Sequence, residues 1–351
     1  MFHKHLKNIY RTSQYNVDRT HFLRMDANER VKPFEKKIIS NLRKIIDDNI
    51  LQSYLTTPQK LINLISRKEK LNNKYINLVP GSESAIKYIF EIFSEKNNKV
   101  VSIYPTYGMI DVYSKIYQLK LEKFYENKIE NFFLNSTYNK KVAFLYIANP
   151  NQPSGRIIKK DLINKIIKKA RSKNKYIIID EAYIDFSNQK SCSQMVREYK
   201  NLIILKTFSK STGIAGLRIG YMICNPNISK IINVIRPVFD ISYFSVKVAE
   251  YFLLNPKILK NYLKEIQICK KFVVQECLRR KLDFLDTQAN FFYIFLKKNK
   301  IKKIYKFLKN KKILVKSKYS KGFKVMDNSI RVTYGSKQQM SYFFKQLDKV
   351  Y

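Results

Sequence analysis

Short runs of apolar, β-branched residues alternate along this chain with segments whose apolar residues recur at helical spacing. The runs predicted as strands lie at 100–104, 142–148, 176–179, 202–206 and 220–224. The segments predicted as helices between them lie at 84–93, 109–117, 161–170 and 228–235. Strands that alternate with helices are typical of βαβ units. We therefore predict an α/β fold with a mostly parallel sheet flanked by helices.

The pattern changes near residue 245. A long helical stretch is predicted from there to residue 281, followed by short strands and one helix at 291–296, 301–308, near Ile313 and near Ile330. We expect a large domain at 36–245, and a smaller α+β domain made from 1–35 together with 246–351. A length of 351 residues fits two domains of ordinary size.

The charge of the chain is strongly positive, because 68 Lys and Arg residues oppose 27 Asp and Glu residues, a formal net charge of +41. Such an excess raises nucleic acid or an anionic membrane surface as a partner. However, the basic residues are spread along the chain, and the abundance of Lys, Asn, Ile and Tyr is typical of an AT-rich coding sequence. We attribute the charge to this bias and expect no nucleic-acid or membrane partner.

Cysteine and histidine are too few and too scattered for a disulfide framework or a zinc site. The four Cys form no C-x-x-C pair, and the three His all precede residue 22. We therefore expect no metal, and a reducing cytoplasmic location. No apolar run approaches the roughly 20 residues of a membrane span, and the N-terminus has no secretory pattern.

The most specific motif is the loop at 207–221, TFSKSTGIAGLRIGY, directly after a predicted strand. Its hydroxyl groups, glycines and Arg218 suit a loop that closes around a phosphate, while Lys210 presents an amine. A buried lysine loses its proton readily and can act as a Schiff-base nucleophile. The loop therefore suits a phosphate-binding site that also presents a Schiff-base lysine.

A second motif is Asp180-Glu181-Ala182-Tyr183, which follows three consecutive isoleucines. One interpretation is a solvated carboxylate at the end of a strand. The other is a buried Asp180, which is costly unless a cation meets it.

Three further motifs are less specific when taken singly. The segment 149–155, ANPNQPSG with its preceding alanine, is either a plain turn or part of a site. Tyr107 in 104–109 is either a stacking platform or a core aromatic. The segment 80–84 opens a helix, whose N–H groups either bind a phosphate or are simply capped.

Together and in this order, these motifs resemble the fold-type I pyridoxal-phosphate (PLP) aminotransferases of class I/II, and within them the histidinol-phosphate aminotransferase subgroup. The resemblance runs from MDANE at 25–29 to IRVTYG at 330–335, nearly the whole chain. It implies an α/β fold with a large PLP-binding domain and a smaller α+β domain. It also implies a transaminase that moves an amino group, from glutamate as the expected donor, to a keto or aldehyde acceptor by a ping-pong mechanism.

The resemblance implies three catalytic residues. Lys210 corresponds to the lysine that carries PLP as a Schiff base and moves the substrate proton. Asp180 corresponds to the acid that pairs with the pyridine nitrogen. Tyr183 corresponds to the tyrosine that binds the phenolate oxygen of the cofactor.

The remaining cofactor contacts come from the same resemblance. Tyr107 would stack on the ring, Gln152 would bind its phenolate oxygen, and Tyr54 would reach the phosphate of the other subunit, which implies a homodimer with shared sites. The residues implied to hold the phosphate within one subunit are Ser82, Glu83 through its backbone N–H, Thr207, Ser209 and Arg218.

Two positions depart from the family pattern. Gln152 stands where the family has Asn, although Asn151 could substitute for it. Lys316 stands where histidinol-phosphate enzymes have a phosphate-binding Arg, and an ammonium does not reproduce the planar guanidinium. The acceptor could therefore differ, for instance a phosphorylated, phosphonate or sugar-pathway keto compound.

Arg331 corresponds to the arginine that binds the substrate α-carboxylate, with a solvated arginine on a strand as the alternative. Two other functions remain open at this point. One is a PLP-dependent amino-acid decarboxylase of the same fold, and the other is a basic nucleic-acid-binding protein on an inactive PLP fold.

Overall fold

The computed structural model describes residues 3–10, 18–54, 58–130, 138–317 and 326–351. The described residues form a seven-stranded sheet in the order β2-β8-β7-β6-β5-β3-β4. Its strands are β2 (Ile76–Val79), β3 (Lys99–Tyr104), β4 (Lys120–Tyr125), β5 (Val142–Ala148), β6 (Tyr176–Asp180), β7 (Leu202–Thr207) and β8 (Gly220–Ile223). Only β8 runs antiparallel to its neighbours in this described sheet. The predicted α/β fold with a mostly parallel sheet is confirmed.

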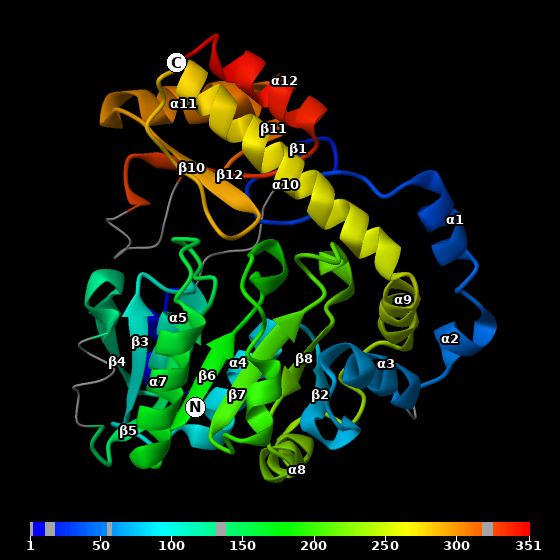
Figure 1. Cartoon of the computed structure of the whole chain (residues 1–351), viewed down its shortest axis with the longest axis vertical. Helices are drawn as coiled ribbons and strands as arrows, with labels where there is room; N and C mark the ends of the chain where they lie inside the picture. The colour runs from blue at the N-terminus through cyan, green and yellow to red at the C-terminus, as the bar shows by residue number, and fades with distance from the viewer. Residues whose placement is uncertain (1–2, 11–17, 55–57, 131–137, 318–325) are drawn as a thin grey trace.

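Helices cover both faces of this sheet, as Figure 1 shows. One face packs against α3 (Gln59–Glu69), α7 (Lys160–Ser172) and α9 (Tyr243–Leu254). The other face packs against α4 (Ser82–Phe93), α5 (Gly108–Ile116) and α8 (Pro226–Ile235). Because successive side chains of a strand point to opposite faces, Ile177 and Ile179 join the first core and Ile178 joins the second. Burial on both faces explains the continuous apolar runs of the sequence.

A smaller unit lies at one end of the large sheet, at the top of Figure 1. Its antiparallel sheet consists of β9 (Phe284–Leu285), β10 (Phe291–Phe295) and β12 (Ser329–Thr333). Its helices are α10 (Pro256–Arg279), α11 (Lys298–Asn310) and α12 (Lys337–Leu347). The N-terminal strand β1 (Leu23–Arg24) pairs with β11 (Ile313–Leu314), which brings the start of the chain to this unit. The domain limits 36–245, and 1–35 with 246–351, stay a prediction.

The remaining helices α1 (Lys36–Arg43) and α2 (Asp48–Gln52) connect β1 to the large sheet, and a short 3₁₀ helix lies at Lys4–Asn8. No helix among the described residues is both long and apolar enough to cross a membrane.

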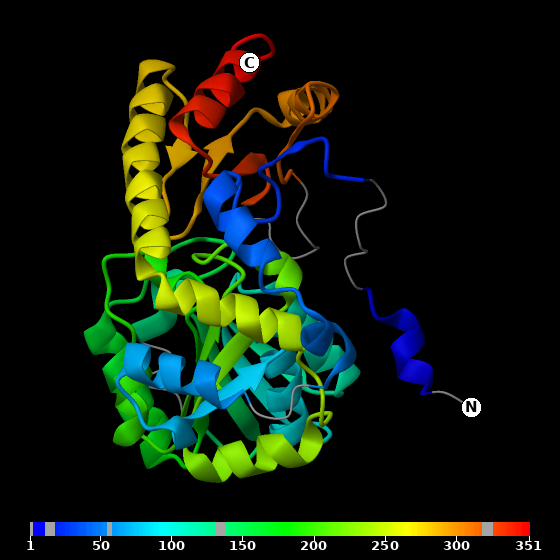
Figure 2. The ribbon, with the colours of Figure 1, turned by 90° about the vertical axis from the view of Figure 1, so that its right-hand side faces the viewer.

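The prediction of one continuous helical stretch between residues 245 and 281 is wrong. This stretch is two helices, α9 and α10, which are separated at Asn255 and Pro256. Proline lacks a backbone N–H and is favoured in the first turn of a helix, so α10 starts there instead of continuing α9. In Figure 2, α10 stands along the smaller unit, whereas α9 is turned sharply away from it, across the large sheet.

Candidate active site

The predicted site residues of the large sheet gather at the carboxyl ends of its parallel strands. Tyr107 follows β3, Gln152 follows β5, Asp180 ends β6 and Thr207 ends β7. In the register of the sheet, Ala148 lies opposite Asp180, and Asp180 lies opposite Leu205. This edge is the usual ligand-binding edge of an open α/β sheet.

Lys210 lies in the loop that leaves β7, and its amine is directed toward the N-terminal segment of the smaller unit. The Nζ atom donates to the carbonyl oxygen of Ala27 at 3.4 Å. It also lies 5.6 Å from the ring centroid of Tyr183. The next residue, Ser211, donates to Asp185 at 2.5 Å, which ties the loop to the segment after β6. The amine therefore sits between the two units, beside a predicted catalytic tyrosine.

Asp180 is buried, with 7% of its surface exposed. Its carboxylate accepts hydrogen bonds from the hydroxyl of Tyr146 at 2.7 Å and from the backbone N–H of Ala182 at 3.0 Å. Burial raises the pKa of Asp180, while these two donors and the charge of Lys210 oppose that rise. The solvated alternative for this carboxylate is wrong. The site instead offers a buried carboxylate that a cationic ligand group would stabilise.

Tyr183 is oriented by a residue of the N-terminal segment. Its hydroxyl accepts a hydrogen bond from Asn28 Nδ2 at 2.9 Å. Asn28 has a left-handed backbone, with φ of 55°, and its N–H donates to Thr333 Oγ1 of β12. This contact was not predicted from the sequence, where 25–29 only marks the start of the resemblance. The signal available in the sequence was the residue type, because asparagine adopts a left-handed backbone conformation more readily than most other residues.

The start of α4 and the loop after β7 form a cradle of the residues that were predicted to bind a phosphate. Gly81 caps α4 with φ of 81°, and Ser82 and Glu83 form the first turn. A Cβ added to Gly81 would lie 2.7 Å from Arg218 Nη2, so only glycine allows this close approach. Arg218 Nη1 in turn lies 3.4 Å from Ser209 Oγ. A helix N-terminus beside a guanidinium and a hydroxyl is a favourable anion site.

The side chain of Thr207 belongs to the same loop. Its Oγ1 accepts a hydrogen bond from the N–H of Ser209 at 3.1 Å, which shapes the turn that precedes Lys210.

Tyr107 caps the N-terminus of α5, close to the cradle. Its hydroxyl donates to Glu83 Oε2 at 3.1 Å. Burial and the neighbouring carboxylate of Glu83 raise the pKa of Tyr107 well above its ordinary value, so the hydroxyl stays a donor. The ring is therefore held between α4 and the end of β3.

The structure distinguishes the two amides of the loop after β5. Asn151 Nδ2 donates to the carbonyl oxygen of Pro105 at 2.7 Å and to Glu126 Oε1 at 2.6 Å. The carbonyl oxygens of both amides, Asn151 Oδ1 and Gln152 Oε1, are buried without a hydrogen-bond partner among the described residues. The amide nitrogen of Asn151 is therefore already engaged by the protein.

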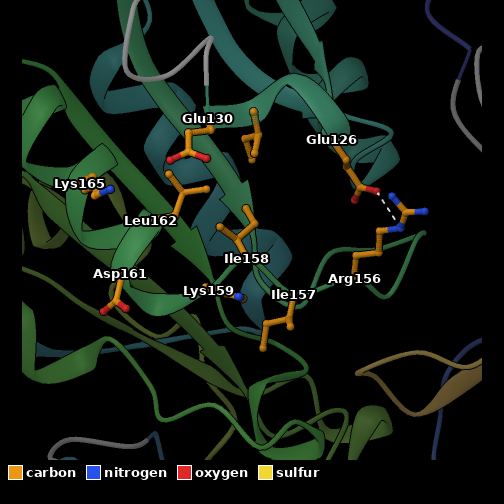
Figure 3. Close-up of a pocket in the computed structure, with 10 residues that line it drawn as sticks. Glu126, Glu130, Arg156, Ile157, Ile158, Lys159, Asp161, Leu162 and Lys165 are labelled. Carbon is orange, nitrogen blue, oxygen red and sulfur yellow. Dashed lines mark ion pairs between the residues drawn. The ribbon is translucent and has the colours of Figure 1, made fainter.

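A separate cavity of about 400 Å³ lies on the other side of Glu126 and is shown in Figure 3. Glu126 and Arg156 form an ion pair of 3.7 Å at its rim. None of the predicted site residues lines this cavity. It is therefore distinct from the site at the strand ends.

Arg331 and Lys316 bring two positive charges together in the smaller unit. Their backbones pair, with Lys316 N–H donating to Arg331 O at 3.0 Å and Arg331 N–H donating to Lys316 O at 2.8 Å. Arg331 is 6% exposed, and its Nη2 donates to the carbonyl oxygen of Asp26 at 2.7 Å. The solvated alternative for Arg331 is therefore wrong. Burial, and then the charge of Arg331, lower the pKa of Lys316.

Tyr54 lies on the outside of the described chain, away from these contacts. It is 72% exposed, and its ring stacks on Phe239 with a centroid distance of 4.3 Å. The structure does not bring it to the other predicted residues within one subunit.

A buried ion cluster below the site was not predicted from the sequence. Lys206 Nζ lies 3.2 Å from Glu69 Oε1 and 3.4 Å from Glu181 Oε2. The hydroxyl of Tyr221 donates to Glu69 at 2.7 Å. A lysine inside an otherwise apolar strand run, LIILKT, was the signal available in the sequence.

Comparison with known proteins assigns the chain to a family. The family model for aminotransferase class I and II matches residues 22–347. The chain belongs to this family. It is an aminotransferase, and its cofactor is PLP.

Three relatives show the extent of the similarity. The histidinol-phosphate aminotransferase of Thermoanaerobacter sp. is 30% identical over 344 residues, which cover 93% of this chain and 92% of that protein. The dihydroxyacetone phosphate transaminase of Campylobacter jejuni is 27% identical over 97% of this chain and 92% of that protein. The crystal structure of histidinol-phosphate aminotransferase from Sinorhizobium meliloti in complex with PLP has the same fold, with a TM-score of 0.85 at 19% identity, covering 99% of this chain and 97% of that one.

The residues of this aminotransferase fit PLP at two points. The cradle of Gly81 and Arg218 suits its phosphate, and the buried carboxylate of Asp180 suits a protonated ring nitrogen. Lys210 lies between them, with its amine toward Tyr183.

The cradle leads to a prediction about cofactor affinity. In Gly81→Ala, the added methyl group displaces the Arg218 guanidinium and strains the backbone. Loss of one charge-assisted contact corresponds to about a 10- to 100-fold rise in the dissociation constant of PLP. Titration of the protein without cofactor by PLP, followed by absorbance, measures this constant.

The matched control is Gly216→Ala in the same loop region, where an added Cβ meets no heavy atom within 4 Å. It should leave the affinity unchanged. A Gly81→Ala variant that binds PLP as tightly as this control would contradict the assignment of the cradle.

Proposed function

We propose that this aminotransferase transfers an amino group from glutamate to a small phosphorylated keto or aldehyde compound by a ping-pong mechanism. The observation that supports the acceptor class is the backbone pairing of Lys316 with Arg331, which places two cations beside each other. Two neighbouring cations would suit substrates that carry a carboxylate and a phosphate. The three relatives described above are all named for phosphorylated compounds.

We assign PLP binding to the residues at the strand ends. Arg218, Ser209, Thr207, Ser82 and the N–H of Glu83 would hold its phosphate. Tyr107 would lie against its ring, and Gln152 would bind its phenolate oxygen through the amide. This assignment is supported by the helix N-terminus and the guanidinium found there.

PLP, when bound, supplies a carbonyl carbon and an electron-withdrawing ring. Lys210 Nζ would attach the cofactor and would then move the proton from the substrate Cα. The negative charge of Asp180 would keep the ring nitrogen protonated. Tyr183, oriented by Asn28, would donate to the phenolate oxygen, and this hydroxyl would then hold the cofactor in one orientation over Lys210.

The substrate would be oriented by the smaller unit. Arg331 would bind the α-carboxylate of glutamate through its planar guanidinium, which determines the Cα bond that faces Lys210. Lys316 would bind the phosphate of the acceptor. An ammonium binds phosphate as a point charge. Lys316 would therefore fix the orientation of the phosphate less strictly than the planar guanidinium of an arginine.

We also propose a homodimer in which Tyr54 reaches the phosphate of the partner subunit. An apolar surface made by Leu51, Tyr54, Val238 and Phe239 is exposed on the described chain. Exposed apolar patches of this kind are typical of protein interfaces. Light scattering should give twice the chain mass of 41.8 kDa, and a monomer would contradict this proposal.

The acceptor class is tested with a matched pair of compounds, dihydroxyacetone phosphate and dihydroxyacetone, together with histidinol phosphate assayed in the reverse direction. We expect glutamate-dependent formation of 2-oxoglutarate with dihydroxyacetone phosphate, or consumption of 2-oxoglutarate when histidinol phosphate is the amino donor. Lys316→Ala should lower kcat/KM for the phosphorylated compound by about 10- to 100-fold, since a charge-assisted bond is lost, and Lys316→Arg should retain most of it. The glutamate half-reaction should change little.

Lys311→Ala, an exposed lysine in the same segment, is the control and should behave as the unmodified enzyme. Equal losses with phosphorylated and unphosphorylated acceptors in Lys316→Ala would contradict the assignment of Lys316. Release of carbon dioxide from glutamate without 2-oxoglutarate would instead support a decarboxylase.

A further inference from the structure

Tyr146 is the side chain, among the described residues, that donates a hydrogen bond to Asp180. It lies on the neighbouring strand β5, where it pairs with Ile178, while Ala148 pairs with Asp180. Alternate residues of a strand share a face, so Tyr146 and Ala148 face the same side of the sheet as Asp180. The small side chain of Ala148 leaves the space through which the longer tyrosine reaches the carboxylate at 2.7 Å.

The hydroxyl of Tyr146 can only be a donor in this contact. The residue is 1% exposed. Burial, and then the charge of Asp180, raise the pKa of Tyr146 well above its ordinary value, so the hydroxyl keeps its proton. An ionised Asp180 is acceptor-only, so the bond stabilises the ionised form of Asp180 over the protonated form.

The other groups around Asp180 act in both directions. Burial raises its pKa, Glu181 raises it further, and Lys210 lowers it. Tyr107 and Tyr183 also lie close enough to interact with this carboxylate or with Tyr146. Removing the hydroxyl of Tyr146 would leave the N–H of Ala182 as the remaining donor to Asp180 among the described residues.

We propose that Tyr146 is a positioning residue for transamination. It orients the Asp180 carboxylate and keeps it ionised, so that the single proton shared between Asp180 and the PLP ring nitrogen stays on the nitrogen. Without the hydroxyl, that same proton shifts toward an Asp180 oxygen, and the ring withdraws electrons less strongly. This inference rests on the proposed role of Asp180.

The test uses holoenzyme prepared with PLP that carries ¹⁵N at the ring nitrogen, whose chemical shift reports its protonation. In the unmodified protein, we expect the shift of a protonated ring. In Tyr146→Phe, which removes one oxygen atom, the shift should move toward that of a neutral pyridine. The kcat should fall about tenfold, as expected for a lost bond to a charged group, with KM unchanged.

The matched control is Tyr88→Phe. Tyr88 is a buried tyrosine of α4 whose hydroxyl donates to Asp240 at 2.9 Å, away from the site. Its loss removes the same kind of bond, and it should leave both the ¹⁵N shift and kcat unchanged. A folded Tyr146→Phe holoenzyme with the unmodified ¹⁵N shift would overturn the inference.

The variant Asp180→Asn separates this inference from the proposed function. If it moves the ¹⁵N shift to the neutral value while Tyr146→Phe does not, the role of Asp180 stands and only the role of Tyr146 is overturned. A neutral ring nitrogen in the unmodified holoenzyme would overturn both.

A second measurement applies if Tyr146→Phe does not fold. Replacing Tyr146 with 3-fluorotyrosine keeps the ring and the hydroxyl, and its ¹⁹F resonance reports the hydrogen bond. We expect this resonance to move when PLP binds, and to move far less in the Asp180→Asn background. A ¹⁹F resonance that is unchanged by PLP would overturn the inference.

Discussion

The site depends on two pairs of consecutive residues, one pair at the end of β6 and one at the end of β7. In each pair, the two side chains point to opposite faces of the large sheet. Glu181 and Lys206 point toward α3, where Lys206 lies within 3.4 Å of both Glu181 and Glu69. Asp180 and Thr207, one residue away in each strand, point toward α4 and the phosphate cradle. Breaking a buried ion pair costs roughly 3–5 kcal/mol, so the charges on the α3 side resist any slip of the two strands. The predicted site residues on the other side thereby keep their register.

The second constraint is the N-terminal segment at 26–28, which contacts residues of both units. The carbonyl oxygen of Ala27 accepts from Lys210, the carbonyl oxygen of Asp26 accepts from Arg331, and the side chain of Asn28 donates to Tyr183. One short segment therefore contacts the predicted lysine, the predicted carboxylate-binding arginine and the predicted tyrosine. Movement of the smaller unit would therefore change the contacts of Lys210 directly.

The elements that could be predicted from the sequence are those whose residue pattern lies within one continuous segment. The continuous β-branched runs predicted β3 and β5 to β8 to within about a residue, and ligand-bearing loops follow such strands. The two edge strands, β4 with exposed charges and β2 with only four residues, were not predicted, and neither was the break before α10. Tyr146, Asn28 and Lys206 were also not predicted, because the role of each depends on a partner far away in sequence. The +41 charge, by contrast, proved uninformative about the site.

We propose that one lysine of this lysine-rich chain, Lys210, carries the cofactor. The direct measurement is borohydride reduction of the protein with one equivalent of PLP, followed by digestion and mass spectrometry. We predict a single pyridoxyl adduct on Lys210 at near one per chain, lost in Lys210→Ala and retained in the control Lys200→Ala, an exposed lysine before β7. Adducts spread over many lysines, or one unaffected by Lys210→Ala, would contradict the account.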